Sequence, residues 1–321
     1  MTPLAEWMAT GQHIRFTRPR GAGRGPLVFE IFCRSEGSGP WLTLLHGFPT
    51  CSWDWAKVAP LLTPHFRLLA FDFLGFGDSD KPEGHAYSLF EQADLTEELW
   101  RQFGVRESAL LVHDYGVSVS QELLARRRFG STAPTAPPGG TPAAKEESFT
   151  AITGVVFLNG GLYPDLHRPI LIQRLLAQPL LGPLLARAMT ERAFRQSFRS
   201  IFSPAHQPSD DELRQHWQAI ERKNGRRVYH RLMGYMAERH RTASRWVSAL
   251  EQAAMPLSFV WGMCDPISGA HVAERLRDRL PAATRVELTD VGHYPQLEVP
   301  ETVAREVVRA FEIETAPTRR G

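Results

Sequence analysis

The chain has 321 residues, 43% of them hydrophobic and 22% charged, so it is long enough for one large globular domain with an insertion and a deeply buried site. Acidic and basic residues are interspersed and leave a net charge of +2, which argues against a nucleic-acid-binding surface. Cys33, Cys51 and Cys264 lack the paired spacing of a zinc site or a disulfide framework, which predicts a reducing, cytoplasmic location.

The beginning of the chain lacks the basic and apolar regions of a signal peptide, and no later stretch is apolar for long enough to cross a bilayer. We therefore expect neither secretion nor membrane insertion. The sequence gives no indication of the oligomeric state.

Short apolar or alternating runs recur between helical stretches, as expected for strands that helices cover on both faces. The expected strands are Leu27–Cys33, Trp41–Leu45, Arg67–Phe71, Ala109–Val112, Ile152–Leu158, Leu257–Trp261 and Arg285–Leu288. Helices are expected between them, for example over Phe90–Phe103, Ser118–Phe129 and Thr302–Ile313. This alternation predicts a mostly parallel, doubly wound sheet with an antiparallel start.

Two stretches interrupt the alternation of strands and helices. Residues 130–148 are rich in Pro, Gly, Ala and Thr, which predicts a flexible surface loop within the core domain. From residue 162 to 250 the strand pattern stops and apolar residues recur at helical spacing. We therefore expect a helical cap at 162–250, inserted into a core domain formed by residues 1–161 and 251–321.

The run from Ala109 to Gly116 is an apolar strand that leads into a sharp turn and then a helix. This context is typical of a nucleophile elbow, in which a reactive side chain is exposed at the strand-to-helix turn. The position usually occupied by serine is here Asp114, and Val112 replaces the first glycine of the motif. Taken alone, the run could also simply end a buried strand.

A second motif lies upstream, where the strand Trp41–Leu45 leads into His46-Gly-Phe-Pro49. In an elbow of this kind, the loop supplies one backbone N–H to an oxyanion hole and the residue after the nucleophile supplies the other. Those residues would be Phe48 and Tyr115. An ordinary Gly-Pro turn is the alternative interpretation of the motif alone.

Two further polar residues follow later strands, in the chain order nucleophile, acid, histidine. Asp265 comes after the strand that ends at Trp261, and His293 comes after the strand that ends at Leu288. Because open α/β sheets bind ligands beyond the carboxyl ends of their strands, we expect Asp114, Asp265 and His293 to form a catalytic triad.

These motifs resemble the epoxide hydrolase and haloalkane dehalogenase branch of the α/β-hydrolases, from about Trp41 to Phe311. Several runs look like one group within this branch that is itself classed as hydrolases by analogy. They are His46–Thr50, Asp72–Gly77, Ser88–Ala93, His113–Gly116, Asn159–Pro164, His167–Pro169 and His293–Glu298. The resemblance implies the α/β-hydrolase fold: a mostly parallel eight-stranded sheet flanked by helices, with an inserted helical cap.

An aspartate nucleophile favours a particular chemistry, because a carboxylate is already ionised near neutral pH and can displace a leaving group directly. Attack by Asp114 on an sp³ carbon would give an alkyl ester of the enzyme. Water activated by His293, which Asp265 orients, would then hydrolyse that ester. The mechanism needs no cofactor and no metal. Attack on an ester substrate would instead form an anhydride, which disfavours an esterase.

The resemblance implies two alternatives for the leaving group. Epoxide hydrolases use one early and one late cap tyrosine, but residues 164–228 contain no tyrosine, so Tyr163 would have to act as the early donor. Tyr229 and Tyr235 are late candidates. Dehalogenases instead bind halide through an asparagine and a tryptophan, and Phe48 and Tyr115 occupy those positions here.

A tryptophan of the cap could replace the missing halide donor, and the candidates are Trp217 and Trp246. We therefore expect an epoxide hydrolase first and a haloalkane dehalogenase second. A non-catalytic ligand-binding protein on the same fold is the alternative from another class. In each case the expected partner is a hydrophobic small molecule, because the cap is rich in apolar residues.

Overall fold

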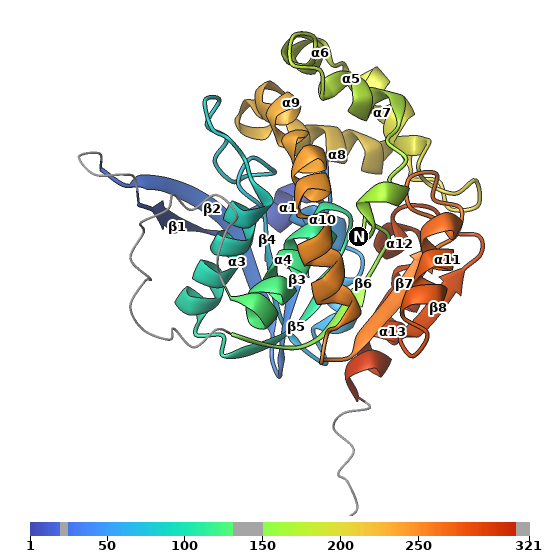
Figure 1. Cartoon of the computed structure of the whole chain (residues 1–321). Coiled ribbons are helices and arrows are strands. Elements are labelled where there is room, and N and C mark those ends of the chain that lie inside the picture. Colours follow the sequence, from blue (N-terminus) through green and yellow to red (C-terminus); the bar gives the residue numbers. More distant parts are fainter. Residues whose placement is uncertain (20–24, 131–149, 313–321) are drawn as a thin grey trace, which may run out of the picture.

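The computed structural model describes residues 1–19, 25–130 and 150–312, which form one eight-stranded sheet, flanking helices and a helical cap (Figure 1). The strand order is β1-β2-β4-β3-β5-β6-β7-β8. Only β2 runs against the others, because it pairs antiparallel with both β1 and β4 while the remaining neighbours are parallel. The predicted fold, with its antiparallel start, is confirmed.

The strands are β1 Gln12–Arg18, β2 Leu27–Gly37, β3 Trp41–Leu45, β4 Arg67–Phe71, β5 Glu107–Val112, β6 Ala151–Phe157, β7 Leu257–Gly262 and β8 Thr284–Leu288. Seven of them coincide with the predicted runs to within a few residues. None of the predicted runs covers β1. This edge strand buries only Phe16, so its apolar signal is weak.

Helices cover both faces of the sheet because neighbouring side chains on each strand point to opposite sides. Leu110 and Val112 of β5 belong to one hydrophobic cluster and Leu111 to the other. Helices α3 Leu89–Phe103, α4 Tyr115–Phe129 and α11 Ala270–Arg279 pack in the first cluster. Helices α1 Leu4–Ala9, α2 Ala59–Leu62 and α13 Pro300–Glu312 pack in the second. Two short helices, η1 Ser52–Trp55 and α12 Pro295–Glu298, lie in loops beyond strand ends.

The predicted helical insertion lies between β6 and β7, gathered at one end of the sheet (Figure 1). It contains η2 Pro164–Leu166, α5 Leu171–Leu176, α6 Gly182–Ala188, α7 Glu191–Arg199, α8 Asp210–Glu221, η3 Arg222–Val228, α9 Tyr229–Leu232 and α10 Gly234–Glu251. The last helix returns to the core and packs along α4. Its Glu238 accepts hydrogen bonds from Ser88 Oγ and Leu89 N, both at 2.6 Å, which ties α10 to the start of α3.

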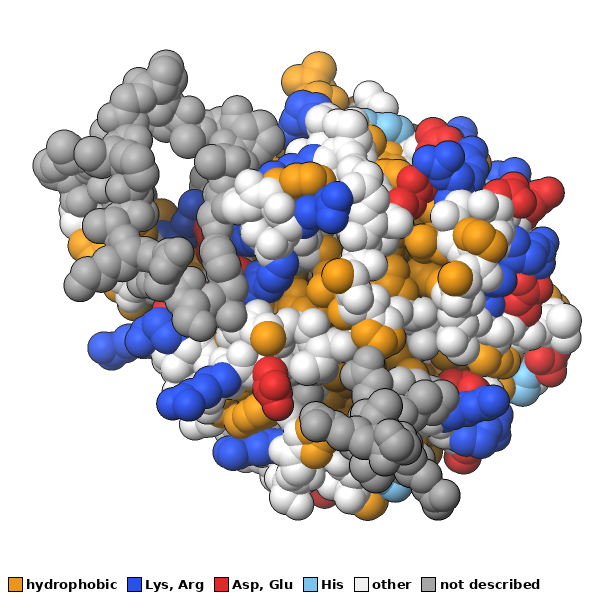
Figure 2. All heavy atoms as spheres, turned by 60° about the horizontal axis from the view of Figure 1, so that its bottom comes forward, with side chains coloured by type: hydrophobic (Ala, Val, Ile, Leu, Met, Phe, Trp, Pro, Cys, Tyr) orange, Lys and Arg blue, Asp and Glu red, His pale blue; other side chains and the backbone are white. Residues whose placement is uncertain are grey.

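The lower face of the molecule carries basic and acidic side chains interspersed around its rim, with hydrophobic side chains nearer the middle (Figure 2). This distribution agrees with the small net charge. No helix within the described residues is long and apolar enough to cross a membrane. The surface loop predicted at 130–148 lies outside the described residues, apart from Gly130, which follows α4.

Close packing of β3 against α4 depends on Gly116, the second residue of α4. A Cβ at this position would collide with the carbonyl oxygen of Leu45 at the end of β3. The added Cβ would be fixed to the backbone of α4, and the Leu45 carbonyl is itself a backbone group. A change of side-chain rotamer therefore cannot relieve the collision. The sequence therefore needs glycine here to bring the helix onto the sheet.

We expect Gly116→Ala to lower the free energy of unfolding by about 1–3 kcal/mol through overpacking, measured by urea denaturation. Gly84→Ala is the matched control, because Gly84 is exposed and a Cβ there would have no neighbour within 4 Å. The control should leave stability unchanged or slightly raised. Equal stability of the two variants would contradict the packing argument.

Candidate active site

Asp114 occupies the turn between β5 and α4, with backbone angles φ 44° and ψ −102°. A positive φ is uncommon for a residue other than glycine and marks local strain, as expected at a nucleophile elbow. The turn is held by backbone hydrogen bonds from Asp114 N to Asn159 O, 2.9 Å, and from Gly116 N to His46 O, 3.0 Å. These bonds fix the carboxyl group at the carboxyl end of the sheet.

The backbone amide of Phe48 donates to Asp114 Oδ2 at 2.9 Å. Tyr115 is the first residue of α4, so its amide has no acceptor within the helix. The His46–Pro49 loop and the start of α4 therefore offer two backbone donors beside the Asp114 carboxyl group. This is the arrangement expected of an oxyanion hole.

His46 supports this loop and takes no part in the carboxyl contacts. Its Nε2 accepts from the backbone N–H of Phe73 at 3.0 Å, so the proton lies on Nδ1, which donates to Gly47 O at 2.8 Å. Burial, only partly offset by the Asp72 carboxylate, lowers the pKa of His46 to about 4. A neutral His46 thus joins the donor loop to the segment after β4.

Asp265 and His293 form a buried pair, with His293 Nδ1 at 2.7 Å from Asp265 Oδ2. The carboxylate also accepts from Ile267 N at 2.7 Å, from Ser268 Oγ at 2.6 Å and from Asn159 Nδ2 at 2.9 Å. Burial opposes ionisation, but His293 and these donors lower the pKa of Asp265 to about 2. Asp265 is therefore a fixed anion that orients the imidazole ring.

The second ring nitrogen of His293 faces the turn at Asp114, with Nε2 at 3.8 Å from Asp114 Oδ1. This separation is too long for a hydrogen bond. Although burial disfavours the imidazolium, the carboxylates of Asp265 and Asp114 raise the pKa of His293 to about 9. Burial raises the pKa of Asp114 above its ordinary value, while His293 and the Phe48 amide favour its ionised form.

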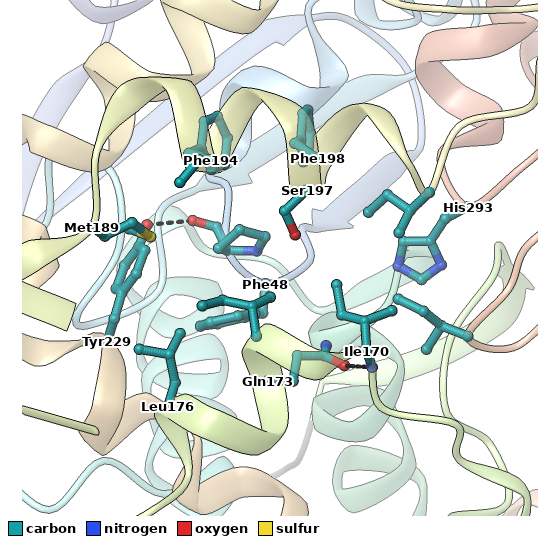
Figure 3. A pocket seen from close by; sticks show the side chains of 15 residues that line it. Phe48, Ile170, Gln173, Leu176, Met189, Phe194, Ser197, Phe198, Tyr229 and His293 are labelled. Atoms are coloured by element: carbon teal, nitrogen blue, oxygen red, sulfur yellow. Dashed lines mark hydrogen bonds between the residues drawn. The ribbon is translucent and has the colours of Figure 1, made fainter. Parts of the chain in front are cut away.

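A cavity of about 160 Å³ opens beside this group, between the core and the cap (Figure 3). Phe48 and His293 border it from the core, and α7 contributes Phe194 and Phe198. The remaining lining side chains come from the segment around α5, from the residues between α6 and α8, and from Pro49, Tyr229 and Ile267. Most of the lining is apolar, so the cavity suits a hydrophobic ligand.

Only two of the four cap residues predicted to bind substrate lie beside the site. Tyr229 lines the cavity, but its hydroxyl donates to Pro49 O at 2.6 Å (Figure 3). The ring of Tyr235 lies 6.1 Å from that of Phe48 and 5.3 Å from that of Tyr115, centroid to centroid. Tyr235 therefore packs against the rings of both residues that were predicted to form the oxyanion hole.

The structure does not bring the other two predicted substrate-binding residues to the cavity. Tyr163 directs its hydroxyl to Glu251 Oε1 at 3.4 Å. Trp217 packs against Phe194, 5.7 Å between ring centroids, and does not line the cavity. Trp246 donates its indole N–H to a carboxylate of α4, Glu122, at 2.7 Å, so this donor is also engaged elsewhere.

Arg239 is a site residue that the sequence analysis missed. It lies one turn after Tyr235 on α10, is only 3% exposed and donates to Gly161 O. Its Nε has no hydrogen-bond partner among the described residues. The guanidinium favours the ionised form of Asp114. The signal was the i, i+4 spacing from Tyr235, which places both side chains on one face of the helix.

Asn159 is a second residue that sequence patterns did not indicate, and it connects the Asp114 turn to Asp265. Its backbone carbonyl accepts from Asp114 N, while its side chain exchanges two hydrogen bonds with Gly262 at 2.6 and 2.8 Å.

Among the described residues, no group of three or more His, Cys, Asp or Glu side chains could hold a metal ion.

Comparisons with known proteins agree with the fold and the motifs. The alpha/beta hydrolase family model matches residues 44–306. The mesoderm-specific transcript homolog protein of Homo sapiens is 40% identical over 303 residues, which cover 92% of this chain and 84% of that protein. This relative accounts for the group of short runs that the sequence analysis singled out.

Two solved structures share the fold at low sequence identity. A loop variant of the haloalkane dehalogenase DbeA from Bradyrhizobium elkanii has a TM-score of 0.72 at 20% identity, covering 97% of this chain and 100% of that chain. The epoxide hydrolase CorEH has a TM-score of 0.69 at 17% identity, covering 94% and 100%. The predicted resemblance to this branch is confirmed at the level of the fold.

The raised pKa of His293 predicts a pH-dependent contribution to stability. Its folded pKa of about 9 exceeds the unfolded value of about 6.5, so the contribution is complete below the unfolded pKa and is lost as pH rises through 9. We expect the difference in unfolding free energy between wild type and His293→Gln to fall by about 3 kcal/mol from about pH 6 to about pH 10. Urea denaturation across this range measures it, and parallel pH curves for the two proteins would contradict the ion-pair interpretation.

Proposed function

Because the chain belongs to the alpha/beta hydrolase family, we propose that it hydrolyses a hydrophobic small molecule through an ester formed on Asp114, with an epoxide as the substrate. The observation that carries this proposal is the geometry of the Asp114 carboxyl group. One oxygen accepts the Phe48 N–H at 2.9 Å, and the other faces His293 Nε2 at 3.8 Å. This geometry supports Asp114 as the nucleophile, the Phe48 amide as an oxyanion donor and His293 as the base, and Phe48 and His293 also line the apolar cavity.

In the first step a carboxylate oxygen of Asp114 attacks an epoxide carbon and forms a C–O bond. The C–O bond of the ring breaks, and its electron pair stays on the ring oxygen, which needs a proton. Tyr235 is the proposed donor, since it is buried against Phe48 and Tyr115 and no hydrogen bond from its hydroxyl is found among the described residues. Tyr229 is less suitable because its hydroxyl already donates a hydrogen bond to Pro49 O.

In the second step water attacks the carbonyl carbon of the ester, and His293 removes a proton from that water. The tetrahedral intermediate then breaks its C–O bond to the oxygen on the substrate carbon, which regenerates the Asp114 carboxylate and releases the diol. One proton of the water ends on the new hydroxyl of the product, and the other returns through His293 to the Tyr235 phenolate.

His293 must be neutral to remove a proton from water, although its pKa is about 9 in the free protein. Esterification removes the negative charge of Asp114, one of the two carboxylates that raise this pKa. The first step therefore lowers the pKa of His293 and prepares it for the second, while the amides of Phe48 and Tyr115 receive the oxyanion.

Haloalkane hydrolysis is the second candidate, and Arg239 is the observation that favours it. A halide needs no proton, but it needs stabilisation as an anion. The buried guanidinium of Arg239, which interacts electrostatically with Asp114 and has an unpartnered Nε, would supply positive charge for that purpose. The two candidates share the ester on Asp114 and differ only in the groups that receive the leaving atom.

Trapping the ester tests the shared chemistry. We expect the His293→Gln variant to accumulate a covalent adduct on Asp114 when incubated with terminal epoxides, because the nucleophile remains and water activation is lost. Intact-mass and peptide mass spectrometry would detect it as the mass of the whole epoxide. A haloalkane would instead add its alkyl group in exchange for a proton.

Asp114→Asn combined with His293→Gln is the isosteric control and should give no adduct. An epoxide adduct without a haloalkane adduct supports the first candidate, and the reverse supports the second. A folded His293→Gln protein that reacts with neither class of compound would favour a non-catalytic ligand-binding protein.

The role of Tyr235 has a separate test in the same trapping background. We expect Tyr235→Phe to slow alkylation by an epoxide about 100-fold or more, because the general acid is lost. Tyr229→Phe is the matched control and should change the rate much less, since that hydroxyl donates to Pro49 O. Single-turnover mass spectrometry gives both rates. Equal effects of the two substitutions would rule out Tyr235 as the specific proton donor.

A further inference from the structure

Four leucines near the outer end of the cap are exposed: Leu171 by 71%, Leu180 by 85%, Leu181 by 53% and Leu184 by 64%. We call them the cap-tip leucines. They are half of the large hydrophobic residues exposed in the described part of the chain, and they fall within fourteen consecutive residues. Helices α5 and α6, which carry or flank them, lie at the end of the cap farthest from the sheet (Figure 1).

These helices are apolar on two sides. Leu176 of α5 and Ala186 of α6 are buried on the inner side, while Leu171 and Leu184 face outward. A surface helix of a water-soluble domain normally presents polar residues on its outer side. A concentrated group of exposed leucines therefore marks a surface that another apolar phase covers.

The net charge of the segment that carries the cap-tip leucines indicates which kind of apolar phase covers them. Residues 166–200 contain six arginines and one acidic residue, Glu191, which gives this segment a net charge of +5 in a chain whose total is +2. The arginines are Arg168, Arg174, Arg187, Arg192, Arg195 and Arg199. Of these, Arg168, Arg174 and Arg192 are exposed and have no acidic partner within 4.0 Å among the described residues.

We propose that the cap tip docks on the surface of a membrane that contains anionic lipids. Leucines that enter the boundary between headgroups and acyl chains, together with arginines that contact lipid phosphates, are typical of proteins that bind in the plane of a bilayer. A second copy of this chain is a poorer occupant, because two segments of net charge +5 would repel each other.

Docking would bring the cavity close to the membrane. Leu176 and Gln173 line the cavity from α5, the same short helix that exposes Leu171. A hydrophobic molecule dissolved in the bilayer would then have a short apolar path around α5 to His293. This delivery of substrate rests on the proposed function, whereas docking itself does not.

Vesicle co-sedimentation of the full-length protein tests the proposal. We expect wild type to sediment with vesicles of mixed phosphatidylcholine and phosphatidylglycerol but not with phosphatidylcholine alone, and binding to weaken as salt is raised. The triple variant Leu180→Ser, Leu181→Ser, Leu184→Ser should lower the binding constant at least about tenfold. Leu61→Ser is the matched control, because Leu61 is 38% exposed on α2, away from the cap, and should bind as wild type does.

The charge contribution has its own variant, Arg174→Glu with Arg192→Glu, which should also weaken binding to the anionic vesicles. Asp114→Asn should bind normally, so that failure of docking and failure of the proposed chemistry are distinguishable. Circular dichroism confirms that each variant is folded. Equal sedimentation of wild type and the triple leucine variant would overturn the proposal. A wild-type dimer by light scattering that the triple variant abolishes, without vesicle binding, would overturn it in favour of a second copy.

Discussion

The backbone of Asp114 is the constraint on which the rest of the site depends. Its positive φ costs roughly 1–3 kcal/mol and persists only if the surroundings hold it. Three glycines allow that crowding. A Cβ at Gly47 would lie 2.9 Å from the Asp114 Cβ, one at Gly160 would lie 3.0 Å from the Asp114 Cα, and one at Gly116 would collide with Leu45 O. The His46–Pro49 loop and the loop after β6 can therefore approach Asp114 closely while α4 packs on β3, and the carboxyl group accepts the amide of Phe48.

Charge balance is the second requirement, because the site is almost fully buried. Asp114 and Asp265 contribute two carboxyl groups, and His293 and Arg239 contribute two groups that can carry positive charge. An isolated buried charge would be costly, whereas alternating partners offset much of the desolvation. Burial lowers the pKa of Arg239, and Tyr235 and Asp114 offset part of that effect, while a backbone carbonyl accepts a hydrogen bond from the guanidinium. The same coupling makes the protonation state of His293 sensitive to the charge of Asp114.

The sequence was sufficient to predict the sheet, because strands depend on local patterns, and the same patterns place the three candidate site residues after strand ends. Asp114, Asp265 and His293 each follow a buried strand, and parallel strands bring such positions to one edge. The strand β1 was missed since Ile14 and Phe16 are its only large apolar residues and Ile14 is only half-buried.

The cap was harder to interpret, because helical spacing shows that helices exist but not which side chains face the cavity. Tyr163 and Trp217 are aromatic residues that pack elsewhere. Arg239 was overlooked because arginine is usually a surface residue, and its burial depends on Gly161, which lies in the loop after β6. Contacts between α10 and that loop are tertiary, and no local pattern encodes them.

The cap contributes two kinds of surface to the site, and their difference constrains the ligand. Helix α10 carries Tyr235, whose ring lies 5.3 Å from that of Tyr115, and the buried Arg239. Both side chains interact electrostatically with Asp114. Helices α5 and α7 bring apolar side chains such as Leu176 and Phe198 to the cavity beside His293. A ligand that contacts both would therefore be apolar over most of its length and carry its electronegative atom at the end near α10. In the proposed chemistry the reacting carbon lies next to that atom, so the polar side would orient the ligand and the apolar side would supply binding energy.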